Sequence, residues 1–358
     1  MLGIISLATS VILMSMNGDT LALGEQNKGY YAPVLFISII LALWIGMRPV
    51  TSVFGDTINY AIIYRALDTS EFPSLSFSSE WGWEIFTYLC KLNGLHVSTY
   101  FTIIAVLYTL TGLWAMKRFV PTSPFLGMLF LVGSAFFFSY GTNGLRNGLA
   151  CNLTLLFMAY ALEERYAKAA LMAIIALSIH RSVMLPIVST VVTLTLVRNP
   201  FSALYIWIGS IICSLFFNEF FSSLVSLIRI DSRIDLYLSA SENTLLTDAE
   251  SGGFFRWDFL LYSALPIIYF LYINSKGVRD GWFNTLIITY LLSNSLWILL
   301  IRAAFSNRFA YLSWFLMPVI FVYPLCNMRA WANQNQAAGI ILFLYISMSI
   351  IMCLLFFL

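Results

Sequence analysis

An arginine in a glycine- and asparagine-rich setting is the residue of this 358-residue chain whose position most strongly suggests chemistry. Arg146 lies between Gly141 and Gly148, at the start of a long apolar run. Its guanidinium is a permanently charged fork that binds two phosphate oxygens at once, and the N–H groups at a helix start also attract anions. An ionisable group at membrane depth marks a functional site by default. Arg146 therefore predicts a phosphate-like anion site.

Three further arginines stand in similar settings. Arg181 follows His180 at a polar break between two apolar runs, and Arg302 and Arg308 bracket a short segment between two others. All four on one face would form a cationic pocket. Arginines at helix ends also extend to lipid headgroups. This alternative, or a salt bridge with a nearby aspartate, stays open above all for Arg65, Arg229, Arg233 and Arg256.

Carboxylates beside aromatic rings are a second chemical feature. Glu80 and Glu84 share a helix face at a spacing of four residues, and Trp81 and Trp83 stand next to them. Surfaces of this kind bind sugars, because carboxylates accept hydrogen bonds from hydroxyls while aromatic rings contact C–H faces. The alternative is an aromatic belt at the membrane interface.

Motifs for nucleotide or metal chemistry are absent from the sequence. It contains no P-loop, no H-E-x-x-H, no G-x-S-x-G and no dinucleotide fingerprint. The five cysteines show neither C-x-x-C pairing nor metal spacing. We therefore expect neither a metal ion nor an organic cofactor, and the net charge of +2 gives no reason to expect nucleic acid as a partner.

The elements that position these residues are helices in a lipid environment. Sixty per cent of the residues are hydrophobic, only 10% are charged, and the mean hydropathy is +0.85, whereas soluble domains carry about 25% charged residues. Apolar stretches of the length that spans a bilayer follow one another almost end to end. We predict about twelve spans, near residues 1–17, 31–49, 98–116, 124–140, 145–162, 167–179, 182–197, 202–218, 257–275, 282–301, 309–325 and 338–358.

Polar breaks divide this single polytopic membrane domain, residues 1–358. The break at His180 separates two runs that are each short for a crossing, which indicates a discontinuous or re-entrant pair. Two breaks are longer than a turn, residues 50–97 and 219–256. We expect both on the same side of the membrane, as external loops with short amphipathic helices at the interface.

Lysines and arginines divide differently between the two sides of this arrangement. Pooled, 9 of the 19 basic residues fall on one side and 10 on the other, which gives no orientation. Separately, four of the five lysines fall on the first side and nine of the fourteen arginines on the second. The first side has the short loops to which the positive-inside rule applies, so we take it as cytoplasmic. The arginine-rich side then faces outward.

Five motifs in order along the chain resemble the EpsG-like, Wzy-type family of bacterial polysaccharide polymerases. They cover about residues 30–325 and comprise Arg48-x6-Gly55-Asp56-Thr57-x2-Tyr60, Glu80-x-Gly82-Trp83, Asn143-x2-Arg146-x3-Ala150, His180-x-Ser182 and Asn307-Arg308. The resemblance implies an all-α integral membrane protein with a GT-C-like glycosyltransferase architecture. It also implies a multi-pass protein of the bacterial inner membrane with its active site facing the periplasm or exterior.

The activity implied is polymerisation of oligosaccharide repeat units carried on undecaprenyl diphosphate, as in the synthesis of O-antigen for lipopolysaccharide or of exopolysaccharide. Arginines would stabilise the leaving diphosphate, and a general base would activate the acceptor hydroxyl. Asp56, Glu80 and His180 are the candidate catalytic residues, and His180 could bind phosphate instead. The diphosphate-binding set is Arg48, Arg146, Arg181, Arg302 and Arg308, with Arg48 paired to Asp56 as one option. The substrate-binding set is Tyr60, Trp83, Glu84, Asn143 and Asn307.

Two other functions would use the same cationic site. A ligase would move a finished glycan from the same diphosphate to another acceptor, and a flippase or exporter would carry the lipid-linked glycan across the bilayer. Transporters often show repeated halves and binding at the midplane, and the sequence shows no repeat. The expected partners are the lipid-linked donor and acceptor, the bilayer, a chain-length regulator and a flippase.

Overall fold

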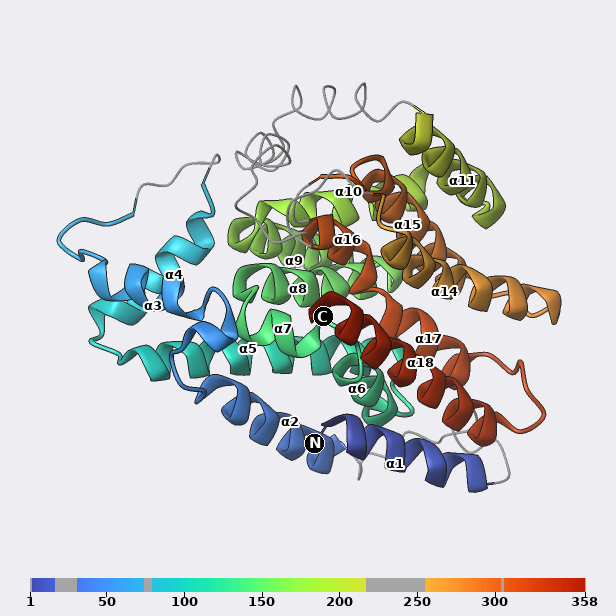
Figure 1. The fold of residues 1–358 in the computed structure, drawn as a ribbon, viewed down its shortest axis with the longest axis horizontal. Helices are drawn as coiled ribbons and strands as arrows, with labels where there is room; N and C mark the ends of the chain where they lie inside the picture. Colours follow the sequence, from blue (N-terminus) through green and yellow to red (C-terminus); the bar gives the residue numbers. More distant parts are fainter. Residues whose placement is uncertain (1, 17–30, 74–78, 217–254, 304–305, 358) are drawn as a thin grey trace. The chain divides into compact units, whose positions relative to one another are not determined.

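The computed structural model describes residues 2–16, 31–73, 79–216, 255–303 and 306–357. Within these ranges every regular element is helical (Figure 1). The all-α prediction is therefore confirmed. The predicted loop 219–256 lies outside the described residues except for its last two.

The helices follow the apolar runs of the sequence closely. The first ten α-helices are α1 (Leu2–Ser15), α2 (Tyr31–Gly46), α3 (Thr57–Ala66), α4 (Trp81–Leu92), α5 (Val97–Phe119), α6 (Pro124–Val132), α7 (Phe137–Thr142), α8 (Leu145–Leu162), α9 (Tyr166–Ile179) and α10 (Met184–Thr195). They are followed by α11 (Pro200–Phe216), α14 (Trp257–Ser275), α15 (Gly281–Leu299), α16 (Ser306–Trp314), α17 (Met317–Asn327) and α18 (Gln334–Phe357). Two short 3₁₀ turns are η2 (Ser52–Phe54) and η3 (Arg181–Val183).

Each of the twelve predicted spans contains a helix, but only some helices are long enough to cross a membrane alone. Among the described residues, five stretches have the length and composition for it: α5, α14, α15, the joined pair α16 and α17, and α18. Five shorter apolar helices of 10–17 residues accompany them. The chain is thus a membrane-embedded helical protein, and the number of crossings stays a prediction.

The structure tests two helix boundaries that the sequence predicts. The predicted span 124–140 is not one continuous helix, because α6 ends at Val132 and α7 begins at Phe137. Glycine and serine at 133 and 134 favour helix poorly, and the Tyr108 hydroxyl donates to the Phe137 carbonyl at 3.0 Å. The predicted break at His180 is confirmed, since α9 ends at Ile179 and η3 begins at Arg181.

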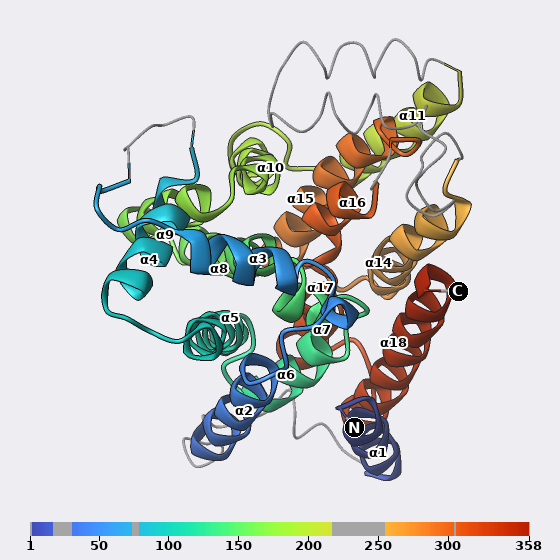
Figure 2. The same ribbon diagram turned by 60° about the vertical axis from the view of Figure 1, so that its left-hand side comes forward.

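The chain forms two compact units, and the first holds α2 to α9. Its centre is α8, which is buried along almost its whole length and packs between α5 and α9 (Figure 1). Asn152 of α8 donates to the Tyr108 carbonyl of α5 at 2.8 Å. A Cβ on Gly112 would lie 3.0 Å from the Asn152 amide, so this glycine lets the two helices approach. Both views show α3 and α4, from residues 50–97, beside one end of this stack (Figure 2).

The second unit holds α10, α11 and α14 to α18, with α15 at its centre. A buried polar network joins four of these helices around Asn294 of α15. Its amide donates to Ser263 of α14 at 3.1 Å and to Ser313 of α16 at 2.9 Å, and its carbonyl accepts from Trp207 of α11 at 2.7 Å. Buried polar groups are costly unless paired, so this network fixes how the helices meet.

Candidate active site in the first unit

A carboxylate shared between a guanidinium and an imidazole is the central feature of the first unit. Glu80 stands directly before α4, and its Oε2 accepts a hydrogen bond from Nη1 of Arg146 on α8. Its Oε1 lies 2.5 Å from Nδ1 of His180, which follows α9. The three side chains are 23, 15 and 11% exposed for Arg146, Glu80 and His180. Three distant segments therefore supply one partly buried cluster.

The hydrogen bonds of this cluster indicate which ring nitrogen of His180 carries the hydrogen. An ionised carboxylate only accepts hydrogen bonds, and the contact with Arg146 favours the ionised form of Glu80. Nδ1 of His180 therefore carries the hydrogen in the bond to Glu80. In the neutral imidazole the lone pair then lies on Nε2, so the cluster orients a nitrogen base.

Arg146 has a second partner on its other side. Its Nε donates to the Tyr60 hydroxyl of α3 at 3.3 Å, and its Cζ lies 5.8 Å from the centre of the Tyr60 ring. Tyr60 in turn meets Trp83 edge to face, with ring centres 5.9 Å apart. Two of the guanidinium nitrogens are thus engaged by the protein itself. The predicted anion site at Arg146 is occupied, in this structure, by the carboxylate of Glu80.

Two glycines allow the close helix contacts that position the residues of this cluster. A Cβ on Gly82 of α4 would lie 2.1 Å from the Ser178 hydroxyl of α9, so these helices meet at a point where no side chain fits. That contact stands two residues from Glu80 and two residues from His180. On α8, a Cβ on Gly148 would lie 2.8 Å from the Tyr140 carbonyl, which places Arg146 in the first turn against α7.

A second cluster adjoins the start of α8. Arg48 is buried and donates to the Thr57 hydroxyl at 3.1 Å and to the Thr142 carbonyl at 2.8 Å. The Asp56 backbone N–H donates to the Asn143 side chain at 2.7 Å. Gly55 has φ +57°, which glycine adopts without strain. These bonds tie the segment before α3 to the residues just before α8.

All three guanidinium nitrogens of the buried Arg48 donate hydrogen bonds to protein groups. Its Cζ also lies 4.7 Å from the centre of the Phe101 ring. Arg48 bonds to Thr57, the residue after Asp56, and these bonds favour a structural role. Its pairing with Asp56 and its binding of a diphosphate stay predictions.

The EpsG family matches residues 32–358, nearly the whole chain. The chain belongs to the EpsG family. The resemblance drawn from the five motifs is therefore confirmed, and it makes the protein a member of a Wzy-like family of polysaccharide polymerases embedded in the membrane. No curated protein and no solved structure matches the chain.

Four of the five motifs that indicated the EpsG family meet in the first unit. Arg181, in η3, lies one residue beyond His180, and Glu84 lies in the first turn of α4. Trp83 is 8% exposed and packs against Tyr60 and Phe86, so little of its ring is open to a sugar. Trp83 thus packs against Tyr60, and its part in substrate binding stays a prediction.

The fifth motif belongs to the second unit. Asn307 and Arg308 lie in the first turn of α16, and Arg302 lies just after α15 with its Cζ 5.9 Å from the centre of the Phe255 ring. Their membership of one pocket with Arg146 stays a prediction. Among the described residues, no group of three or more His, Cys, Asp or Glu side chains could hold a metal ion.

The sequence identifies Glu80, Arg146 and His180 as candidates one by one but does not show that they bind one another. Separations of 66 and 100 residues along the chain carry no pairing signal. The sequence offers one physical signal: a partly buried arginine needs an acceptor, and Glu80 and Glu84 are two candidate carboxylates.

Proposed function

We propose that this EpsG-family protein is a glycosyltransferase that polymerises undecaprenyl-diphosphate-linked repeat units on the outer face of the bacterial inner membrane. The growing chain leaves its lipid diphosphate and passes to a hydroxyl of the incoming lipid-linked unit. The observation that carries the proposal is the Glu80 carboxylate between Arg146 and His180. It supplies an oriented base inside a family of polysaccharide polymerases.

The base in this proposal is His180. The acceptor hydroxyl attacks the anomeric carbon of the donor, the bond from that carbon to the diphosphate oxygen breaks, and Nε2 of His180 takes the hydroxyl proton. Glu80 accepts from Nδ1 and stabilises the resulting imidazolium, as a carboxylate does in a catalytic triad. Asp56 and Glu80 remain the competing bases, and Glu80 is less suited because both of its oxygens are already engaged.

Arg146 holds the carboxylate in this mechanism. Its bonds to Glu80 and Tyr60 keep Glu80 ionised and aligned with the imidazole. The leaving diphosphate needs positive charge more than a proton. We assign that role to Arg181, which follows His180 directly, while the parts of Arg302 and Arg308 stay predictions from the sequence.

The test is the repeat-length ladder of glycan from cells that carry variants at matched expression. Glu80→Gln and His180→Ala should each lower polymer formation at least ~100-fold, because a positioned base contributes that much or more. Glu71→Gln is the control, since Glu71 is an exposed carboxylate of the same segment. Normal ladders from both Glu80→Gln and His180→Ala would overturn the mechanism. A lost ladder from Asp56→Asn alone would transfer the base to Asp56.

The same cells separate the rival functions. A polymerase lesion leaves single repeat units on the outer leaflet, whereas a ligase lesion leaves full-length chains that are not attached to their acceptor. A flippase lesion leaves lipid-linked units on the cytoplasmic leaflet. Either of the last two patterns would contradict the proposal.

A further inference from the structure

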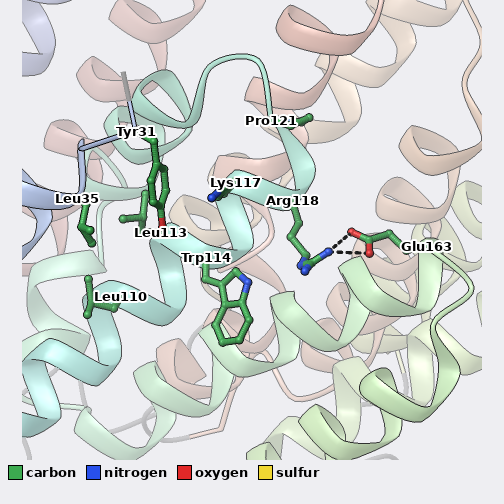
Figure 3. A pocket seen from close by; sticks show the side chains of 9 residues that line it. All are labelled: Tyr31, Leu35, Leu110, Leu113, Trp114, Lys117, Arg118, Pro121 and Glu163. Carbon is green, nitrogen blue, oxygen red and sulfur yellow. Dashed lines mark hydrogen bonds and ion pairs between the residues drawn. The ribbon is translucent and has the colours of Figure 1, made fainter. Parts of the chain in front are cut away.

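A cavity of about 490 Å³ opens at the end of the first unit away from Arg146. It lies between α2, α5 and the end of α8 (Figure 3). Its lining residues are Tyr31, Leu35, Leu110, Leu113, Trp114, Lys117, Arg118, Pro121 and Glu163. Neither the proposed catalysis nor any motif of the sequence involves these residues.

The lining is apolar along one stretch and charged at its end. Leu110, Trp114 and Lys117 follow one another on α5 at spacings of four and three residues, which places them on one helix face. Seven residues of helix rise about 10 Å, so the apolar stretch has the length of several methylene groups. A slot of this kind fits a molecule with an apolar chain and a polar head.

The head must be anionic, because the charged end carries more cations than anions. Nη1 of Arg118 donates to both oxygens of Glu163 at 2.8 and 2.7 Å, and Arg165 reaches the same carboxylate at 3.3 Å. Lys117 is exposed, stands 3.6 Å from the centre of the Tyr31 ring, and pairs with no carboxylate among the described residues. The lining thus carries two cations, Lys117 and Arg118, and one carboxylate.

One donor at this end is left without an acceptor. Nε of Arg118 is buried and has no hydrogen-bond partner in the part of the chain that the structure describes. A buried donor without a partner costs free energy, so Glu163 does not meet the whole hydrogen-bonding capacity of Arg118. Figure 3 shows Lys117 beside Tyr31 and Trp114, with Arg118 turned toward Glu163.

The place of the cavity along the helices matches the headgroup level of a bilayer. Lys117 and Arg118 lie in the last turn of α5, which has the length and composition of a membrane span. Tyrosine, tryptophan and lysine gather at such interfaces. We propose that this cavity binds the phosphate headgroup and upper acyl chain of an anionic phospholipid.

Purified full-length protein in a neutral detergent can be titrated with phosphatidylglycerol or with phosphatidylcholine of the same acyl chains, and bound lipid counted by native mass spectrometry. We expect phosphatidylglycerol to be preferred. Lys117→Gln should weaken its binding about fivefold, the effect of one basic residue near an anionic lipid. Lys168→Gln is the matched control, because Lys168 is exposed near the same end but does not line the cavity.

A second variant tests the apolar slot without a change of charge. Leu110→Trp fills the slot and should lower phosphatidylglycerol binding, while the melting temperature reports whether the variant is folded. Unchanged binding by Lys117→Gln, or equal losses in Lys117→Gln and Lys168→Gln, would overturn the proposal. Displacement of the lipid by inorganic phosphate at equal concentration would identify a free anion as the ligand and would also overturn it. None of these measurements depends on polymer synthesis.

Discussion

Helix α8 has an arginine and glutamate pair at each end, and the two pairs differ in their third member. At the start, Glu80 is shared between Arg146 and His180. At the end, Glu163 is shared between Arg118 and Arg165. A carboxylate between a permanent cation and a base can support proton transfer, whereas one between two permanent cations leaves a fixed positive charge. The first arrangement suits a reaction, and the second suits binding.

Reversing the pair at the start of α8 gives the largest expected effect. Arg146→Glu and Glu80→Arg should each abolish the glycan ladder and destabilise the protein by about 3 kcal/mol or more, because each leaves like charges together in a partly buried site. The double variant should recover thermal stability in detergent but not the ladder, since His180 then lacks a carboxylate. A double variant that also regains the ladder would show that Glu80 serves only to neutralise Arg146.

The contact of α4 with α9 gives an intermediate effect. Gly82→Ala introduces a Cβ 2.1 Å from the Ser178 hydroxyl, and we expect a loss of about 1–3 kcal/mol from overpacking together with a weaker ladder. Adding Ser178→Gly removes the obstructing side chain and should restore both, as judged by melting temperature and ladder length. Failure of this second change to restore activity would mean that the contact does not align Glu80 with His180.

The pair at the end of α8 gives the smallest effect on synthesis. Glu163→Gln removes the one carboxylate of the cavity lining, so the ladder should stay normal while phosphatidylglycerol binding rises about fivefold. Native mass spectrometry and the ladder are measured on the same variant. A lost ladder would contradict the division of roles between the two ends.

The helices could be predicted from the sequence because runs of apolar residues and polar breaks are local signals. The break at His180 was found in this way, and the gap between Val132 and Phe137 was missed because a single glycine within an apolar run does not by itself end a helix. The twelve spans located the helices, but the grouping into two units depends on contacts between residues far apart in sequence.

The site was predicted as separate residues and not as a cluster. Residue type and setting drew attention to Arg146, Glu80 and His180 individually. Their pairing depends on the approach of α4 to α9, which a glycine opposite a serine permits and which no spacing along the chain reveals. Arg48 shows the converse, because its type suggested an anion site while its burial gives it protein partners.

The burial of α8 has a consequence for the two charged clusters at its ends. Neighbouring helices cover α8 along almost its whole length, and its own hydrogen bonds fix its length. From Arg146 to Glu163 the backbone rises about 26 Å. This rigid spacing keeps the two clusters apart, so a ligand bound at one end cannot touch the other.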